Sequence, residues 1–310
     1  DGFSYEAWRN CFELVNLNLQ NQEVRDYLLD VIRFWIDKFD IDGIRLDCAD
    51  CLDFGFMEQM RAATEEKKKD FWLMGEVIHG DYSRYIQDGK RLLHSVTNYE
   101  LHKGLYSGHN DNNYFEIAHT IRREFDENGG IYRGMKLYSF VDNHDVDRIA
   151  SKLNREAYLI PVHALLYFLP GIPSVYYGSE FGISGKKEGG NDAPLRPALN
   201  LKELKKDSPH PELEEWIREL SEIRKKHPAC VEGSYRELVL TNRQYAFCRS
   251  SASDYLLVAV NNDDQDAQIQ IPVDQNSTYT EIRTGEEYLP GNGRVTVTIP
   301  ACGCVLLERA

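Results

Sequence analysis

Apolar and polar positions repeat along the chain with two different periods, and these periods predict its elements. Between residues 21 and 39, apolar side chains recur every three to four residues, which predicts a helix capped by Asn21 with Trp35 packed on its buried face. Similar patterns predict helices at about 54–69, 114–125, 156–168 and 211–226. Short apolar runs predict five strands between them, near 42–47, 71–75, 95–98, 137–141 and 174–177.

This alternation of strands and helices predicts parallel strands with helices packed outside them. Asp47 and Glu76 end two successive strands, 29 residues apart, and Asp145 follows 69 residues later, a distance of about two further βα units. Acidic residues therefore gather at the carboxyl ends of the strands, where βα barrels carry their catalytic residues. Five strands are three fewer than a closed barrel needs. The pattern thus predicts an α/β fold, the later part of a (β/α)8 TIM barrel with about five βα units, whose first half is absent or supplied by another polypeptide. A five-stranded open sheet, covered by helices on both faces, is the alternative.

After Pro228 the pattern changes to short alternating runs separated by polar turns such as NDDQD and PGNG. Such runs are typical of antiparallel strands. We therefore expect two domains, a partial catalytic barrel at 1–229 and a small β-sandwich-type domain at 230–310. At the end of the last barrel strand, the two-residue period predicts that Tyr176 and Tyr177 point in opposite directions.

The stretch DGIRLD, residues 42–47, carries the first candidate chemistry. The period of a strand places Arg45 and Asp47 on one face, where the arginine would hold the carboxylate ionised. Such a pair is either structural or the nucleophile of a covalent glycosyl transfer. Glu76 follows the apolar strand FWLMG, and these surroundings disfavour a charged carboxylate, as an acid catalyst requires. Asp145, after His144 in FVDNHD, is a third acid that could bind sugar hydroxyls.

DGIRLD, GEV at 75–77 and FVDNHD at 140–145, in this order and spacing, resemble the α-amylase family of glycoside hydrolases. PGIPSVYYGSEFG at 170–182 supports the resemblance, which covers nearly the whole chain. The resemblance implies Asp47 as the nucleophile with Arg45 as its partner, and Glu76 as the general acid and base. It implies that His144 and Asp145 bind the sugar at the cleavage site.

The resemblance further implies that Asp192 and Arg196, in NDAPLRPAL, contact the next sugar. Two departures from the family pattern matter. Asp50 and Cys51 stand where many starch-active members carry a lysine and a histidine, which favours a small-oligosaccharide enzyme over a long-chain endo-amylase. The family's motif after the third strand is not in this sequence. The usual calcium ligands, which belong to this motif, are therefore missing as well. We expect no required cofactor and no metal-ligating residue, with calcium left open.

The implied function is a retaining α-glycoside hydrolase that acts on short maltodextrins or related oligosaccharides through a covalent glycosyl-enzyme intermediate. A transglycosidase of the same family, in which an acceptor sugar replaces water, is an alternative. A non-catalytic carbohydrate-binding or assembly protein on the same fold is another, although the retention of Asp47 and Glu76 argues against it.

Composition narrows the partners and the compartment. The net charge of −14 disfavours nucleic acid and anionic membranes, and the best apolar run, 164–169, is stopped by Pro170. The seven cysteines are an odd number and are spread over a long chain, which favours reduced thiols and a cytoplasmic location. The expected partner is the oligosaccharide substrate, with a homo-oligomer or pairing with the missing half of the barrel left open.

Overall fold

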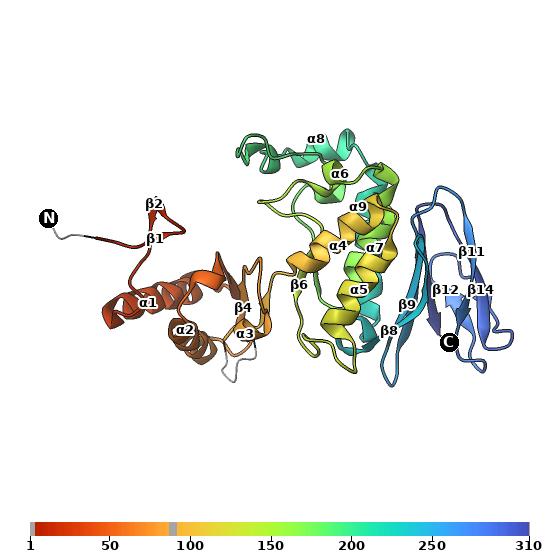
Figure 1. Ribbon diagram of the computed structural model, residues 1–310, viewed down its shortest axis with the longest axis horizontal. Coiled ribbons are helices and arrows are strands. Elements are labelled where there is room, and N and C mark those ends of the chain that lie inside the picture. The colour runs from red at the N-terminus through yellow and green to blue at the C-terminus, as the bar shows by residue number, and fades with distance from the viewer. Residues whose placement is uncertain (1–3, 87–91, 310) are drawn as a thin grey trace. The chain divides into compact units, whose positions relative to one another are not determined.

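The computed structural model describes residues 4–86 and 92–309, and the chain divides into two compact units, 1–97 and 98–310 (Figure 1). The strands described in the first unit are β1 (Ala7–Trp8), β2 (Cys11–Val15), β3 (Gly43–Leu46), β4 (Trp72–Gly75) and β5 (Ser95–Val96). Its helices are α1 (Gln22–Phe39), η1 (Ala49–Cys51), α2 (Phe54–Lys67) and α3 (Ser83–Ile86), where η denotes a 3-10 turn.

Helix α1 confirms the predicted start and end. The side chain of Asn21 accepts a hydrogen bond from the backbone N–H of Glu23, and Asp40 ends the helix in a left-handed conformation. The predicted packing of Trp35 is wrong, because this residue is 47% exposed. Only Leu29 and Ile36 of α1 are buried. The apolar face that the sequence pattern shows is therefore wider than the face that α1 buries. The Trp35 ring instead contacts Phe39 on the same helix.

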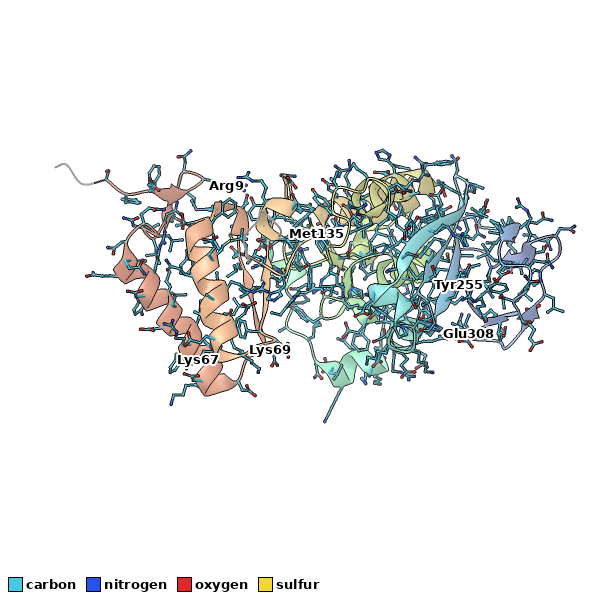
Figure 2. All side chains as sticks on the ribbon, turned by 90° about the horizontal axis from the view of Figure 1, so that it is seen from below. Arg9, Lys67, Lys69, Met135, Tyr255 and Glu308 are labelled. Carbon is cyan, nitrogen blue, oxygen red and sulfur yellow. The ribbon has the colours of Figure 1, made fainter. Side chains whose placement is uncertain are left out.

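The parallel sheet of the first unit has the order β3-β4-β5. Strand β3 pairs with β4 from Gly43 opposite Trp72 to Leu46 opposite Gly75, which sets the carboxyl ends of both strands side by side. Helix α2 connects them, as the alternating pattern predicts. Lys67, at the end of α2, lies 2.8 Å from a carboxylate oxygen of Asp37 and ties α2 to α1 (Figure 2).

The second unit opens with helices around two parallel strands, β6 (Tyr138–Phe140) and β7 (Ile172–Ser174). Its α-helices are α4 (Tyr99–Asn110), α5 (Tyr114–Phe125), α6 (Ile149–Lys152), α7 (Leu159–Phe168), α8 (Leu201–Lys206), α9 (Pro211–Lys226) and α10 (Ala229–Glu232). Its 3-10 turns are η2 (Glu156–Tyr158), η3 (Ser179–Phe181) and η4 (Ala193–Leu195). Figure 1 shows α4, α5, α7 and α9 packed beside one another and next to the C-terminal sheet.

The C-terminal part of the second unit is antiparallel, as the sequence predicts. A six-stranded sheet has the order β13-β12-β15-β10-β9-β8, and β11 pairs with β14. These strands are β8 (Ser234–Leu240), β9 (Gln244–Ser250), β10 (Tyr255–Asn261), β11 (Ala267–Pro272), β12 (Tyr279–Glu281), β13 (Glu287–Tyr288), β14 (Arg294–Ile299) and β15 (Cys304–Arg309). Buried side chains of both sheets form one core, including Leu257, Ile271, Val297 and Leu307. The domain boundary at 229/230 stays a prediction.

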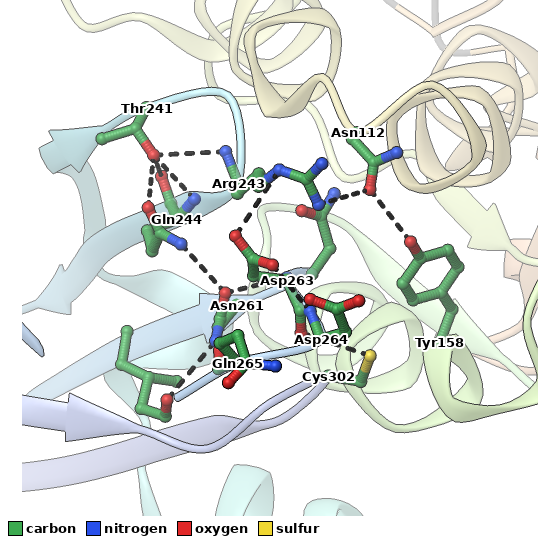
Figure 3. Close-up of polar contacts among 12 residues, drawn as sticks. Asn112, Tyr158, Thr241, Arg243, Gln244, Asn261, Asp263, Asp264, Gln265 and Cys302 are labelled. Carbon is green, nitrogen blue, oxygen red and sulfur yellow. Dashed lines mark hydrogen bonds and ion pairs between the residues drawn. The ribbon is translucent and has the colours of Figure 1, made fainter. Parts of the chain in front are cut away.

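Polar contacts join the helices of the second unit to its sheets (Figure 3). The guanidinium of Arg243 donates to the side chain of Asn112 at 3.1 Å and lies 3.5 Å from a carboxylate oxygen of Asp263. The hydroxyl of Tyr158 donates to the same Asn112 oxygen. Asn112, between α4 and α5, thus links η2 to the turn between β8 and β9. Among the helices that the structure describes, none is both long enough and apolar enough to span a membrane.

Candidate functional site

Asp47 and Glu76 lie directly after β3 and β4, at the paired carboxyl ends of these strands. Two backbone hydrogen bonds hold the two turns together. The N–H of Glu76 donates to the carbonyl of Leu46 at 2.8 Å, and the N–H of Ala49 donates to the carbonyl of Glu76 at 2.8 Å. The nearest side-chain oxygens of Asp47 and Glu76 lie within 4.8 Å of each other. The fold therefore brings the first two predicted carboxylates together.

Arg45 contacts both of these carboxylates. Its guanidinium lies 2.6 Å from Asp47 and 3.0 Å from Glu76. The side chain of Asp47 is 73% exposed, whereas that of Glu76 is only 6% exposed. The sequence analysis predicted an ion pair of Arg45 with Asp47 alone, and it predicted apolar surroundings for Glu76. The expected burial is present, but the surroundings include a cation, because Arg45 is long enough to reach across to the next strand.

A glycine lets Glu76 approach the β3 turn. A Cβ atom at Gly75 would lie 2.5 Å from a methyl carbon of Leu93 and 2.7 Å from the Cβ of Ala49. Real side chains do not tolerate such contacts, so any larger residue at position 75 would displace the Leu93 side chain and Ala49 of η1. Close packing therefore explains why the first residue of the GEV motif is a glycine.

Cys48 lies between the two carboxylates, and sequence reasoning missed this. Its sulfur and the nearest oxygens of Asp47 and Glu76 all lie within 4.8 Å of one another, a spacing that could suit a metal ion. Burial, together with the charges of Asp47 and Glu76, raises the pKa of the Cys48 thiol to about 11. The guanidinium of Arg45 already supplies a cation to both carboxylates, so these residues do not fit a metal site.

An open cleft of about 420 Å³ lies beside Asp47 in the first unit. Its wall includes the indole of Trp8 and three amide side chains, those of Asn16, Asn18 and Gln20. Amides donate and accept hydrogen bonds, and an indole offers a flat apolar face, so such a wall suits a polyhydroxylated ligand. Asp47 lines this cleft, so its carboxylate is open to a ligand bound there.

His144, Asp145 and Arg196 form a cluster in the second unit. The Nε2 atom of His144 lies 2.9 Å from one oxygen of Asp145, and the guanidinium of Arg196 lies 2.7 Å from the other. Arg196 also donates through Nε to the backbone carbonyl of His144 at 3.0 Å. The backbone N–H of Asp145 is bound by the side chain of Asn143. Asp145 is therefore held from three sides while its side chain stays one-third exposed.

Asp192 joins this cluster through Arg196, with 3.1 Å between the guanidinium and a carboxylate oxygen. The other oxygen of Asp192 lies 2.8 Å from the ammonium group of Lys187. Lys187, with a smaller contribution from Arg196, lowers the pKa of Asp192 below its usual range. Sequence reasoning missed Lys187, because nothing in the spacing of a loop reveals a contact across its turn.

The prediction that Tyr176 and Tyr177 point in opposite directions is wrong. Their rings contact each other at 4.7 Å between centroids, and the guanidinium of Arg148 lies 4.1 Å from the Tyr176 ring. The strand β7 ends at Ser174, so both tyrosines follow it in a turn where the two-residue period no longer applies. The Tyr176 ring lies 6.4 Å from that of His144, next to the His144 cluster.

The predicted site residues thus lie in two clusters, one in each compact unit. The first unit holds Arg45, Asp47 and Glu76, and the second holds His144, Asp145, Asp192 and Arg196. Each cluster presents carboxylates held by arginine, Asp47 and Glu76 directly after β3 and β4, Asp145 in the loop after β6 and Asp192 just before η4. Paired carboxylates of this kind can supply a nucleophile, an acid and a hydrogen-bonding partner for hydroxyl groups.

Known proteins match this chain over nearly its whole length. The family model described as alpha amylase, catalytic domain, matches residues 4–283. The chain is 24% identical over 316 residues to a cyclomaltodextrinase of Geobacillus thermopakistaniensis, and 26% identical over 318 residues to a maltogenic alpha-amylase of Bacillus acidopullulyticus. Each alignment covers 98% of this chain and 51% of the relative, so the chain spans about half the length of these proteins.

A solved structure is similar over almost the whole chain. The alpha-amylase of Geobacillus thermoleovorans, complexed with acarbose, matches with a TM-score of 0.82 at 21% identity. The match covers 96% of this chain and 66% of that one. The comparison supports an α/β fold of the TIM-barrel type with a β-rich C-terminal part.

Proposed function

This chain belongs to the alpha-amylase catalytic-domain family, and from that premise we propose that it is a glycosidase that cleaves α-glucosidic bonds with retention of configuration. The observation that carries the proposal is the pair of Asp47 and Glu76, whose nearest oxygens lie within 4.8 Å of each other. Retaining glycosidases hold their two carboxyl groups roughly 5 to 5.5 Å apart, whereas inverting ones leave room for a water molecule between them.

In the proposed reaction, an oxygen of Asp47 attacks the anomeric carbon and forms an ester with it. Glu76 donates a proton to the leaving glycosidic oxygen, and its carboxylate then takes a proton from the water that hydrolyses the ester. Arg45 orients both carboxylates through its contacts of 2.6 and 3.0 Å. His144 and Asp145 are proposed to bind the hydroxyls of the sugar that is cleaved.

Asp192 and Arg196 are proposed to bind the next sugar. The proposed substrates are short maltodextrins or related oligosaccharides. The names of the two relatives, a cyclomaltodextrinase and a maltogenic alpha-amylase, favour α-glucans of this size. Asp50 and Cys51 favour them as well, since they replace the lysine and histidine of many starch-active members. A cytoplasmic location and the absence of a required cofactor stay predictions.

We further propose that the chain is the later part of a (β/α)8 barrel, with about five βα units at 1–229 and a β domain at 230–310. Within residues 4–86 and 92–309, five strands pair in parallel, three in one sheet and two in another, and this supports the count. The match to only about half of each relative supports it too. Pairing with a further polypeptide or a second copy stays part of this proposal.

The test is the reaction of the chain with pure maltotriose, followed by proton NMR. The proposal expects the α-anomer of the new reducing sugar to appear first and to convert to the β-anomer only by mutarotation. First appearance of the β-anomer would contradict the retaining mechanism. Products longer than maltotriose would favour the transglycosidase alternative over simple hydrolysis.

A pair of variants separates catalysis from mere sugar binding. Asp47→Asn and Glu76→Gln should each lower kcat by roughly three or more powers of ten, because each removes one of the two reacting carboxyl groups. Asp70→Asn, a change at an exposed position of the same unit, is the matched control and should leave kcat unchanged. Binding of maltotriose without turnover by the parent chain would favour the non-catalytic alternative.

A further inference from the structure

We propose that Cys48 is a positioning residue that holds Asp47 and Glu76 at a fixed separation, with its backbone N–H bound to Glu76 and its thiol facing both carboxylates. The inference rests on the proposed function, since it assigns a role to a residue between the two proposed reacting groups. The Cys48 sulfur lies within 4.8 Å of an oxygen of each acid.

The backbone of Cys48 provides the first contact. Its N–H donates to Oε2 of Glu76 at 3.2 Å, the same oxygen that lies 3.0 Å from Arg45. The residue adopts a left-handed conformation with φ of 41°, which is uncommon for any residue other than glycine, asparagine or aspartate. The backbone bonds of Leu46 and Ala49 to Glu76 on either side maintain this conformation. The turn thus aims an N–H at the acid of the neighbouring strand.

The thiol provides the second contact. Burial, together with the negative charges of Asp47 and Glu76, keeps it protonated at neutral pH, as its raised pKa indicates. A protonated thiol is a donor, and the nearest carboxylate oxygens of Asp47 and Glu76 lie within 4.8 Å of its sulfur. Arg45 contacts Asp47 at Oδ1, at 2.6 Å. The thiol therefore restricts rotation of a side chain that is largely exposed.

The direct test compares Cys48→Ala with Cys48→Ser on a small α-glucoside, with kcat and KM measured separately. We expect Cys48→Ala to lower kcat about tenfold with KM little changed, because a donor to a charged group is lost. Cys48→Ser keeps a donor and should restore kcat to within about threefold of the parent. Cys11→Ala, a change at a cysteine of β2, is the matched control.

An unchanged kcat in Cys48→Ala would overturn the proposal. Equal losses in Cys48→Ala and Cys48→Ser would also overturn it, because the thiol would then act by its volume and not by its hydrogen. Either result, obtained while Asp47→Asn stays inactive, leaves the proposed function in place. An active Asp47→Asn variant would instead contradict the proposed function itself.

A second measurement does not depend on activity or on the folding of the alanine variant. Alkylation of Cys48 by iodoacetamide, followed on its peptide by mass spectrometry, reports how strongly the carboxylates suppress its thiolate. The proposal expects alkylation to be several-fold faster in Asp47→Asn than in the parent, with the rate at the exposed Cys51 as the internal reference. An equal rate at Cys48 in both proteins would overturn it.

Discussion

Arg45 lies 3.0 Å from Glu76 and 2.6 Å from Asp47, so one guanidinium holds the two carboxylates that end adjacent strands. The fork of a guanidinium can bind two separate acceptors at once, which a lysine ammonium on a flexible stem does with much less geometric control. Glu76 is buried, so its contact with Arg45 and with the N–H of Cys48 offsets the cost of removing a carboxylate from water.

The Arg45→Lys variant should therefore lose activity although it keeps its charge. We expect kcat/KM to fall about 100-fold, since neither carboxylate is then oriented by a planar donor pair. We also expect the free energy of unfolding to fall by about 1 to 3 kcal/mol, because Glu76 stays buried with a weaker partner. Steady-state kinetics and urea denaturation measure the two effects.

The matched control for this change is Arg33→Lys on α1, where the arginine forms a surface ion pair with Asp30. This variant should behave like the parent in both measurements. A fully active Arg45→Lys variant would contradict the orienting role of the guanidinium.

Arg196 should contribute to substrate binding more than Lys187 does. Arg196 contacts Asp145, Asp192 and the carbonyl of His144, whereas the side chain of Lys187 contacts only Asp192 among these residues. Arg196→Ala should therefore raise KM for maltotriose about tenfold or more, and Lys187→Met less than that. The same Lys187→Met change should raise the pKa of Asp192 toward its usual value, which carbon NMR titration can follow. A larger effect of Lys187→Met on KM would contradict this order.

Glu124 should make stability depend on pH. It is fully buried on α5, and burial raises its pKa to about 7, opposed by a hydrogen bond from Asn98. The folded state therefore keeps a proton that the unfolded state releases from about pH 4.5 upward. Stability is greatest below this pH and falls as the pH rises through about 7, by roughly 3 kcal/mol in total.

The Glu124→Gln variant, which cannot ionise, should remove this dependence. Its thermal midpoint should exceed that of the parent at about pH 8 and match it near pH 4.5. Glu127→Gln, at an exposed position after the same helix, is the control and should follow the parent at both pH values. A parent that is as stable as Glu124→Gln at about pH 8 would contradict the burial of an unpaired carboxylate oxygen at this position.

Periodicity predicted the elements whose apolar stripes are regular, and it failed where tertiary contacts decide. Helices α5 and α9 have the predicted ends, but α4 was not predicted. Its sequence contains Gly104 and Gly108, which disfavour a helix in isolation. A Cβ atom at Gly108 would lie 2.8 Å from Ile117 of α5, so the glycine permits close packing that no local pattern reveals.

The candidate site likewise contains some residues that the sequence predicted and others that it did not. Motif order predicted Asp47, Glu76 and Arg45, because strand period and βα spacing place such residues at one edge of a sheet. The contacts of Cys48 and Lys187 depend on a left-handed turn and on a loop bridge between Glu188 and Asn191, and neither has a sequence period. Residues of this kind become visible only when the backbone is known.

The central claim, that Asp47 is the nucleophile, is tested most directly by trapping its ester. An activated α-glucosyl fluoride, with a second fluorine on the sugar ring, forms the glycosyl-enzyme with loss of fluoride and hydrolyses slowly, so the ester accumulates. Peptide mass spectrometry should then find the sugar on Asp47 in the parent and on no residue in Asp47→Asn. A label on Glu76 or Asp145, or turnover of the reagent by the parent with no labelled peptide, would contradict the account.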